Sequence, residues 1–278
     1  MSDAISRRTL IAAGASAAVA PSALANLKKP ASPPLTFLLV HGTWHGGWVW
    51  RDVAARLRAA GHRVATPTLT GCGEREHLSR PDVGLDTHIM DLVNVVRFQE
   101  LTDIIVVGHS FTGVAMTGLI DRMPANIRHA VYFDAIVPSE TRRAGVPRDA
   151  DGRLPDWFVE RSQHFEDGYK MDLWRDYPID MLLPPEHPQA ERVRRLITTH
   201  PAKTWTDELT LKNGGWRNVA RTFIHCVGQT YRMSSEKMVG PARGPGWEFI
   251  ELDVPRDGMI THPALVADTL LKIGSQRG

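Results

Sequence analysis

The stretch from Ile104 to Gly113, Ile-Ile-Val-Val-Gly-His-Ser-Phe-Thr-Gly, is the most informative part of the sequence. A short run of β-branched residues meets a Gly-X-Ser turn, and small residues then begin a helix. A serine in such a tight bend projects its hydroxyl from the sheet edge, while the next backbone N–H points into the same space. Ser110 is therefore the candidate nucleophile. The usual Gly-X-Ser-X-Gly pattern is imperfect, because Thr112 holds the fifth position and the glycine follows one residue later.

Apolar runs on both sides of this stretch alternate with helical patterns. Strands are expected at residues 36–40, 62–66, 104–107, 127–133, 222–227 and 247–252. The helices between them keep the i, i+3, i+4, i+7 spacing of one buried face. Such alternation predicts a parallel sheet covered on both faces, with the ligand site at the carboxyl ends of the strands.

The ends and the middle of the chain follow other patterns. Residues 1–25 contain a twin-arginine pattern at Arg7 and Arg8, followed by an alanine-rich apolar stretch and an Ala-X-Ala cleavage site. This order of features predicts a signal peptide. Residues 26–34 form a Pro-rich linker, and 35–137 with 214–278 form the α/β core. Residues 138–213 lack the alternation and are predicted to be a helical cap insertion. Its tryptophans are candidates for pocket lining: Trp157, Trp174 and Trp205.

The composition of the chain indicates which classes of binding partner to expect. The formal net charge of +2 indicates no basic footprint for nucleic acid, so a small-molecule substrate is expected. After the signal peptide no segment has the 18 or so apolar residues of a membrane span, and export predicts a periplasmic or secreted enzyme. Cys72 and Cys226 are expected to be unpaired thiols, and neither has neighbours with zinc-like spacing. We expect no metal site and no cofactor.

Several linked motifs resemble one family of enzymes. They are the loop His-Gly-Thr-Trp-His-Gly-Gly-Trp at 41–48, the loop Pro-Thr-Leu-Thr-Gly-Cys-Gly-Glu-Arg at 67–75, Leu-Asp-Thr-His at 85–88, Gly-His-Ser at 108–110 and Val-Tyr-Phe-Asp-Ala at 131–135. Together they resemble bacterial α/β-hydrolases of the branch with plant salicylate-binding esterases, hydroxynitrile lyases and pyrethroid-type carboxylesterases. The resemblance implies an α/β-hydrolase fold with a mostly parallel sheet of about eight strands. It also implies a Ser-His-Asp triad headed by Ser110, with the backbone N–H groups of Thr43 and Phe111 as the oxyanion hole.

Two triad positions depart from that family pattern. The acid of the family follows the strand at 222–227, where this chain has Val227-Gly228-Gln229-Thr230 without a carboxylate. The histidine of the family lies in a Gly-His-Asp-X-Met segment, which reads Pro-Arg-Asp-Gly-Met here, so Arg256 takes its place. Arginine does not act as a base near neutral pH, because its pKa exceeds about 12.

Three interpretations remain open. In the first, His262 is the base, oriented by Asp257, Asp253 or Asp134, although a histidine before a proline also suits a surface helix start. In the second, the fold carries out lyase-type chemistry with His41, His45 or His109 as acid or base and Arg256 holding an anionic group. In the third, the protein binds a ligand without efficient catalysis.

The first interpretation predicts an esterase-like hydrolase for a small, mostly apolar ester or lactone. The other two predict a lyase-type or ligand-binding homologue without a complete triad. Asp134, at the end of its strand, is counted with Arg256 and the three histidines among the candidate substrate-binding residues.

Overall fold

The computed structural model describes residues 33–139, 143–228, 239 and 242–276. The chain divides into two compact units, Met1–Pro33 and Pro34–Gly278. The fold described below is that of the second unit. The predicted signal peptide and almost all of the predicted linker fall outside the described residues.

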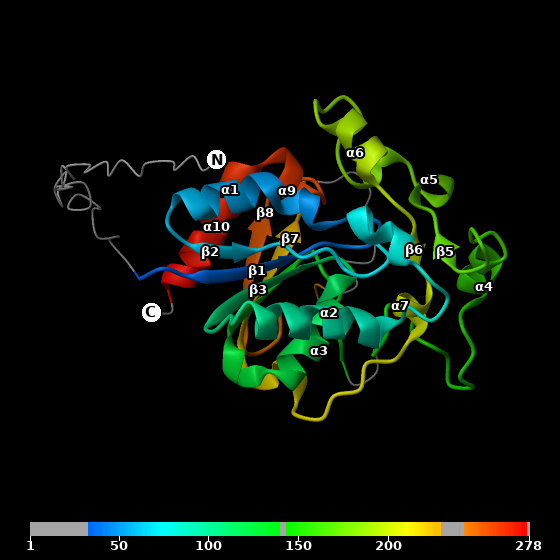
Figure 1. The fold of residues 1–278 in the computed structure, drawn as a ribbon, viewed down its shortest axis with the longest axis horizontal. Coiled ribbons are helices and arrows are strands. Elements are labelled where there is room, and N and C mark those ends of the chain that lie inside the picture. Colours follow the sequence, from blue (N-terminus) through cyan, green and yellow to red (C-terminus); the bar gives the residue numbers. More distant parts are fainter. Residues whose placement is uncertain (1–32, 140–142, 229–238, 240–241, 277–278) are drawn as a thin grey trace, which may run out of the picture. The chain divides into compact units, whose positions relative to one another are not determined.

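A parallel sheet forms the centre of this unit (Figure 1). Its six strands are arranged in the order β2-β1-β3-β4-β7-β8, and every neighbouring pair is parallel. The strands are β1 (Thr36–Val40), β2 (Arg63–Ala65), β3 (Ile104–His109), β4 (Ile127–Phe133), β7 (Ala220–Cys226) and β8 (Trp247–Leu252). All residues of β3 are buried, because helices cover the sheet on both sides.

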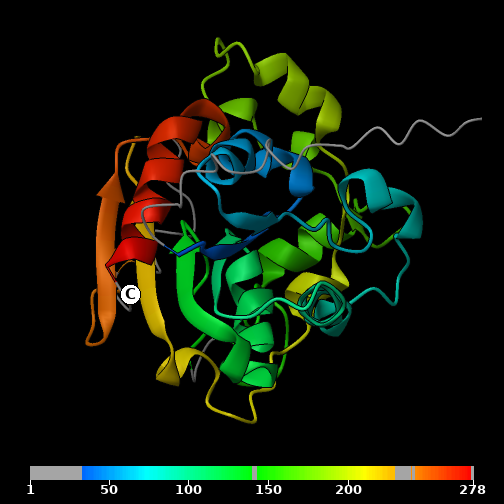
Figure 2. The same ribbon diagram turned by 60° about the vertical axis from the view of Figure 1, so that its left-hand side comes forward.

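Two layers of helices cover the sheet (Figures 1 and 2). One face carries α1 (Arg51–Ala59), α9 (Gly258–Thr261) and α10 (Pro263–Ser275), and the other carries α2 (Leu85–Phe98) and α3 (Thr112–Arg122). The stripe Leu85, Ile89, Leu92 and Val96 of α2 is buried, as its spacing predicts. Pro263 occupies the first turn of α10, where its missing N–H costs no hydrogen bond.

The segment between β4 and β7, which we call the cap segment, is built from short elements. They are α4 (Asp156–Ser162), β5 (Lys170–Met171), α5 (Leu173–Asp176), α6 (Ala190–Leu196), β6 (His200–Pro201) and α7 (Lys203–Thr206). Short 3-10 turns complete the described elements: Gly47–Trp50, Gly73–Leu78, Pro124–Asn126, Ile179–Met181 and Gly215–Asn218.

The fold class agrees with the prediction, but the strand count differs from it. The main sheet has six strands among the described residues, where about eight were expected. Two further strands, β5 and β6, pair antiparallel within the cap segment. Each has only two residues, which is too short for a sequence pattern to reveal.

Among the described residues, no helix has both the length and the apolar composition needed to cross a membrane.

Candidate active site

Ser110 lies in the sharp turn between β3 and α3, as the opening stretch predicts. Its φ of 58° is in the left-handed region, which few residues with a side chain adopt. The surrounding backbone holds this conformation, since the Ser110 N–H donates to the Phe133 carbonyl at 3.3 Å and its carbonyl accepts from the Ile136 N–H at 2.8 Å. Strain of this kind is typical of functional sites.

The imperfect glycine pattern has a structural explanation. A Cβ on Gly113 would lie 2.1 Å from the carbonyl oxygen of Ile136 in the loop after β4, so α3 comes very close to that loop at this position. The side chain of Thr112 instead donates a hydrogen bond to the His41 carbonyl. The glycine is therefore needed one residue later than in the usual pattern.

Ser110 opens into a cavity of about 590 Å³ beneath the cap segment. Five of the candidate residues line it: Thr43, His45, His109, Ser110 and Arg256. The cap segment contributes mainly aromatic and apolar side chains: Pro147, Pro155, Trp157, Phe158, Phe165, Met171, Tyr177, Met181, Leu182 and Trp205. The site is a mostly apolar pocket with a few polar groups, as is usual for small-molecule sites.

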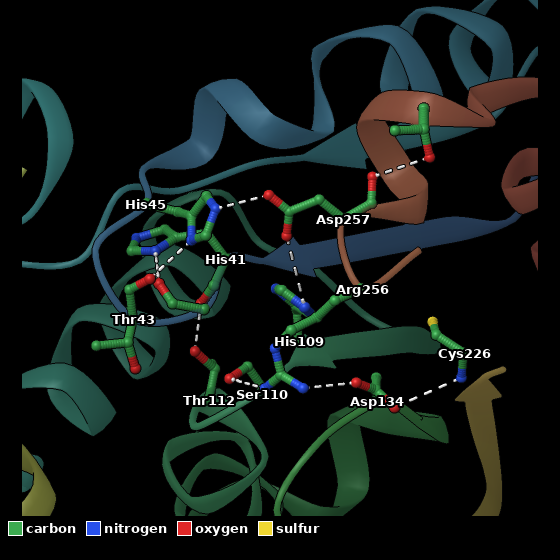
Figure 3. Close-up of polar contacts among 12 residues, drawn as sticks. His41, Thr43, His45, His109, Ser110, Thr112, Asp134, Cys226, Arg256 and Asp257 are labelled. Atoms are coloured by element: carbon green, nitrogen blue, oxygen red, sulfur yellow. Dashed lines mark hydrogen bonds and ion pairs between the residues drawn. The ribbon is translucent and has the colours of Figure 1, made fainter. Parts of the chain in front are cut away.

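The Ser110 hydroxyl is held by an arginine rather than by a histidine (Figure 3). Arg256 Nη2 donates to Ser110 Oγ at 2.7 Å, and Nη1 of the same guanidinium lies 2.6 Å from Asp134 Oδ2. All three side chains are buried, with Ser110 9% exposed. Ser110, Arg256 and Asp134 thus form a hydrogen-bonded chain with the order of a serine, base and acid triad, but its middle member cannot accept a proton.

The carboxylate at the end of this hydrogen-bonded series, Asp134, follows a different strand from the one that the resemblance implies for the acid. Asp134 directly follows β4, with a φ of 44°, and its Oδ1 accepts from the Cys226 N–H at 3.4 Å. The position expected to carry the acid, Gly228, is crowded. A Cβ there would lie 2.8 Å from Asp253 Oδ1 and 2.9 Å from the Val254 nitrogen.

A second polar pair, His45 and Asp257, lies beside this chain (Figure 3). His45 Nδ1 is 2.7 Å from the Thr43 carbonyl, and Nε2 is 3.0 Å from Asp257 Oδ2. Asp257 Oδ1 lies 4.0 Å from His109 Nε2. Asp257 therefore faces two histidines, neither of which is His262.

His41 and His109 are both buried and differ in their contacts. His41 Nδ1 donates to the Gly42 carbonyl at 2.8 Å, while Nε2 accepts from the Leu69 N–H at 3.0 Å. Burial lowers the pKa of His41 to about 3, so the ring is neutral and joins two loops. Burial, and then the charge of Arg256, hold the pKa of His109 well below its ordinary value.

The two expected oxyanion-hole residues share a cap neighbour, Trp205. Its ring stacks on Phe111 with centroids 5.1 Å apart, and its Nε1 donates to Thr43 Oγ1 at 3.2 Å. Phe111 follows Ser110 in the turn, and Thr43 lies in the loop after β1. Trp205 thus connects the cap segment to both.

Comparisons with known proteins agree with this fold. The model of the alpha/beta hydrolase family matches residues 37–269. This chain belongs to the alpha/beta hydrolase family. It is 35% identical over 243 residues to a carbendazim hydrolyzing esterase of Nocardioides sp. (strain SG-4G), covering 86% of this chain and 99% of that protein. It is 26% identical to the probable esterase PIR7A of Oryza sativa subsp. indica, covering 86% and 97%.

A solved structure has the same fold. The extracellular alpha/beta-hydrolase from a Paenibacillus species superimposes with a TM-score of 0.69 at 22% identity, covering 86% of this chain and 98% of that one. This chain is therefore an α/β-hydrolase with esterase relatives.

In this α/β-hydrolase, His262 does not lie at the site as the first interpretation requires. Its side chain is exposed at the start of α10, and Nδ1 is 2.8 Å from the Thr261 hydroxyl. Asp253 is exposed as well. His262 is the residue before Pro263, and the surface helix start that this position also suggests is what the structure has. Asp257 is buried at the site, but it faces His45 instead.

Other residues of the site were not singled out from the sequence. Arg161, Asp176 and Tyr177 line the cavity together, with the Arg161 guanidinium 4.7 Å from the centre of the Tyr177 ring. They lie on short cap elements whose sequence carries no periodic signal. Of the three cap tryptophans, Trp157 and Trp205 line the cavity, while Trp174 packs against the core instead.

Both cysteines are buried, and no disulfide joins them. Within the described ranges, His, Cys, Asp and Glu side chains form no group of three or more that could hold a metal ion.

Proposed function

We propose that this α/β-hydrolase cleaves a small, mostly apolar ester or lactone, with Ser110 as the nucleophile. One observation carries the proposal: a serine in a strained turn presents its hydroxyl to an aromatic-lined cavity of about 590 Å³. That volume suits a single small molecule. The esterase relatives support the reaction class.

Arg256 has a defined part in this proposal. Because its guanidinium donates to Ser110 Oγ, the O–H of the serine points away from Arg256, and its proton has to pass to another group of the site. The adjacent cation stabilises the negative charge that develops on the serine oxygen as it attacks. The N–H groups of Phe111 and Thr43 are proposed to bind the carbonyl oxygen of the substrate.

The test combines labelling with turnover. Purified protein is treated with a fluorophosphonate probe and assayed with a p-nitrophenyl ester series. We expect labelling and turnover in the wild type, and loss of both in Ser110→Ala. The control is Ser275→Ala, whose exposed hydroxyl lies at the end of α10 and whose removal leaves both signals unchanged. Labelling that persists in Ser110→Ala would exclude this serine as the nucleophile.

A second candidate function follows from the Arg256 contact. Since arginine does not take the serine proton, the same pocket suits a lyase-type or ligand-binding homologue in which Ser110 and Arg256 hold a polar group of the ligand. This alternative would be supported if the wild-type protein is not labelled by the fluorophosphonate probe and does not hydrolyse the p-nitrophenyl esters.

We also propose that the enzyme is exported, on the basis of the twin-arginine pattern at Arg7 and Arg8. Cell fractionation tests this. The wild type is expected in the periplasm or the medium, and the double variant Arg7→Lys and Arg8→Lys is expected to stay in the cytoplasm. If the wild type and the double variant are found in the same cell fractions, export by the twin-arginine route is refuted.

A further inference from the structure

We propose that His45 and Asp257 share one buried proton, and that this pair gives the proton to the departing alcohol during hydrolysis. The catalytic step depends on the proposed function, whereas the shared proton follows from hydrogen-bond geometry alone.

The contacts of His45 require the additional proton. Its Nδ1 is 2.7 Å from the Thr43 carbonyl, which only accepts, so Nδ1 carries a hydrogen. Its Nε2 is 3.0 Å from Asp257 Oδ2. A neutral imidazole would then direct a lone pair at an ionised carboxylate, and the two would repel. A hydrogen bond exists only if a second proton lies between Nε2 and Oδ2, and the imidazole nitrogen, which is ordinarily the more basic of the two groups, carries it.

His41, in the same loop, provides the internal comparison. Its Nδ1 also faces a carbonyl, at 2.8 Å, but its Nε2 faces the Leu69 N–H at 3.0 Å. A single proton satisfies both contacts, so His41 is a neutral imidazole. The difference between the two histidines is the carboxylate opposite His45.

The surroundings keep this proton inside the site. His45 and Asp257 are both buried, and with one shared proton the pair is neutral as a whole, which lowers the cost of its burial. Arg256, the residue before Asp257, is paired with Asp134. The remaining oxygen of Asp257 makes no hydrogen bond with the described residues, and His109 Nε2 lies 4.0 Å from it.

The His45–Asp257 pair lies beside Ser110, where the departing alcohol needs a proton. His45 lines the same cavity as Ser110, and Asp257 directly follows Arg256 in the chain. Arg256 holds the serine oxygen but has no site for a proton. We therefore assign the proton for the leaving group to the adjacent pair of His45 and Asp257.

The step balances as follows. Ser110 Oγ forms a bond to the carbonyl carbon of the ester, and the bond from that carbon to the alcohol oxygen breaks. The shared proton goes to the alcohol oxygen, and the proton of the serine hydroxyl replaces it on the pair. The products are the acyl-serine and the neutral alcohol, with the pair back in its original state.

Asp257→Asn tests the shared proton without removing the contact. The amide N–H donates to His45 Nε2, so the ring keeps its position, but the second ring proton is lost. In ¹⁵N-edited NMR of the histidine side chains, we expect two protonated ring nitrogens for His45 in the wild type and one in Asp257→Asn. His262→Gln, a change at an exposed ring, serves as the control and is expected to leave the His45 signals unchanged.

The leaving group tests the catalytic step. We compare kcat/KM for p-nitrophenyl butyrate, whose leaving group departs without a proton, with that for ethyl butyrate, whose leaving group needs one. General acid catalysis contributes about 10²-fold or more, so Asp257→Asn is expected to lose about that factor on the ethyl ester and much less on the p-nitrophenyl ester. A merely structural role of Asp257 would reduce both rates by the same factor.

Each outcome decides one part of the proposal. A single protonated ring nitrogen on His45 in the wild type refutes the shared proton. Equal losses on the two esters refute proton donation, while Ser110-dependent turnover keeps the proposed function. A wild type without turnover on either ester refutes the proposed function and the donation step with it, and the NMR measurement still decides the proton.

Discussion

Arg256 lies between the Ser110 hydroxyl and the Asp134 carboxylate, and its chemistry limits what the serine can do. The guanidinium stabilises negative charge on the serine oxygen, but it accepts no proton. A side chain with a basic nitrogen between Ser110 and Asp134 would complete a triad with these two residues. Asp134 would then be the orienting acid.

Arg256→His is therefore expected to raise esterase activity. An imidazole between Ser110 and Asp134 adds a general base, which contributes about 10²-fold or more to a rate. The measurement is kcat/KM on p-nitrophenyl acetate, with Arg256→Lys as the matched control, because lysine keeps the charge without adding a base. The increase should vanish in the double variant Ser110→Ala and Arg256→His. No increase over the wild type would show that Asp134 does not orient a histidine here.

At the scale of elements, Gly113 in the first turn of α3 closely approaches the backbone of Ile136 in the loop after β4. Gly118, in the same helix, is also crowded, but its neighbour is the flexible tip of Ile89, at 2.4 Å from an added Cβ. Both glycines lower the intrinsic stability of the helix relative to alanine, but an added Cβ would meet rigid backbone at Gly113 and a flexible side chain at Gly118.

Gly113→Ala is expected to destabilise the protein. Alanine favours a helix by about 1 kcal/mol over glycine, but a Cβ 2.1 Å from the Ile136 carbonyl displaces the backbone, and overpacking costs about 1–3 kcal/mol or more. Gly118→Ala is the control, with a smaller loss or a gain, since Ile89 can move aside. Urea denaturation followed by circular dichroism measures both. Equal stabilities of the two variants would contradict the assigned role of Gly113.

At the scale of the whole molecule, burial of neutral histidines links stability to pH. Burial lowers the pKa values of His41, His88, His109 and His200 below the ordinary 6.5. Their stabilising contribution is complete above about pH 6.5, where the unfolded chain also carries neutral histidines. As the pH falls, the unfolded chain takes up protons that the folded protein excludes, and stability is lost.

We expect the free energy of unfolding to decrease from about pH 7 to pH 5, by up to about 1.4 kcal/mol per pH unit for each such histidine. Urea denaturation at several pH values measures this slope. His88→Gln keeps a donor for the Thr70 carbonyl and removes one titrating group, so its slope should be smaller. His262→Gln, at an exposed ring, should leave the slope unchanged. A pH-independent stability over this range would refute the linkage.

Much of the fold could be predicted because its signals are local. The buried run and turn at Ile104 to Gly113 predicted β3, the bend at Ser110 and the start of α3. The alternation of strands and helices predicted a parallel sheet. The cap segment could not be predicted in the same detail, because its elements of two to seven residues carry too few positions to establish a period.

The candidate site was predicted in part. Ser110, Arg256 and Asp134 were each singled out, but their hydrogen-bonded chain was not foreseen. His262, the base of the first interpretation, is exposed in the structure, while Asp257 is paired with His45 from a loop more than 200 residues earlier. Such pairings depend on how loops pack, which no local pattern encodes.

The sequence by itself determined the family and predicted the tight turn at Ser110 and an arginine at the histidine position of the family, since each depends on residue type and short spacing. Only the tertiary structure decided which groups lie around the serine. It brings Arg256 and Asp134 to Ser110, and His45 to Asp257, because parallel strands bring their carboxyl ends to one edge of the sheet however far apart they are in the chain. Proton sharing depends on distances between atoms, and those exist only once the chain has folded.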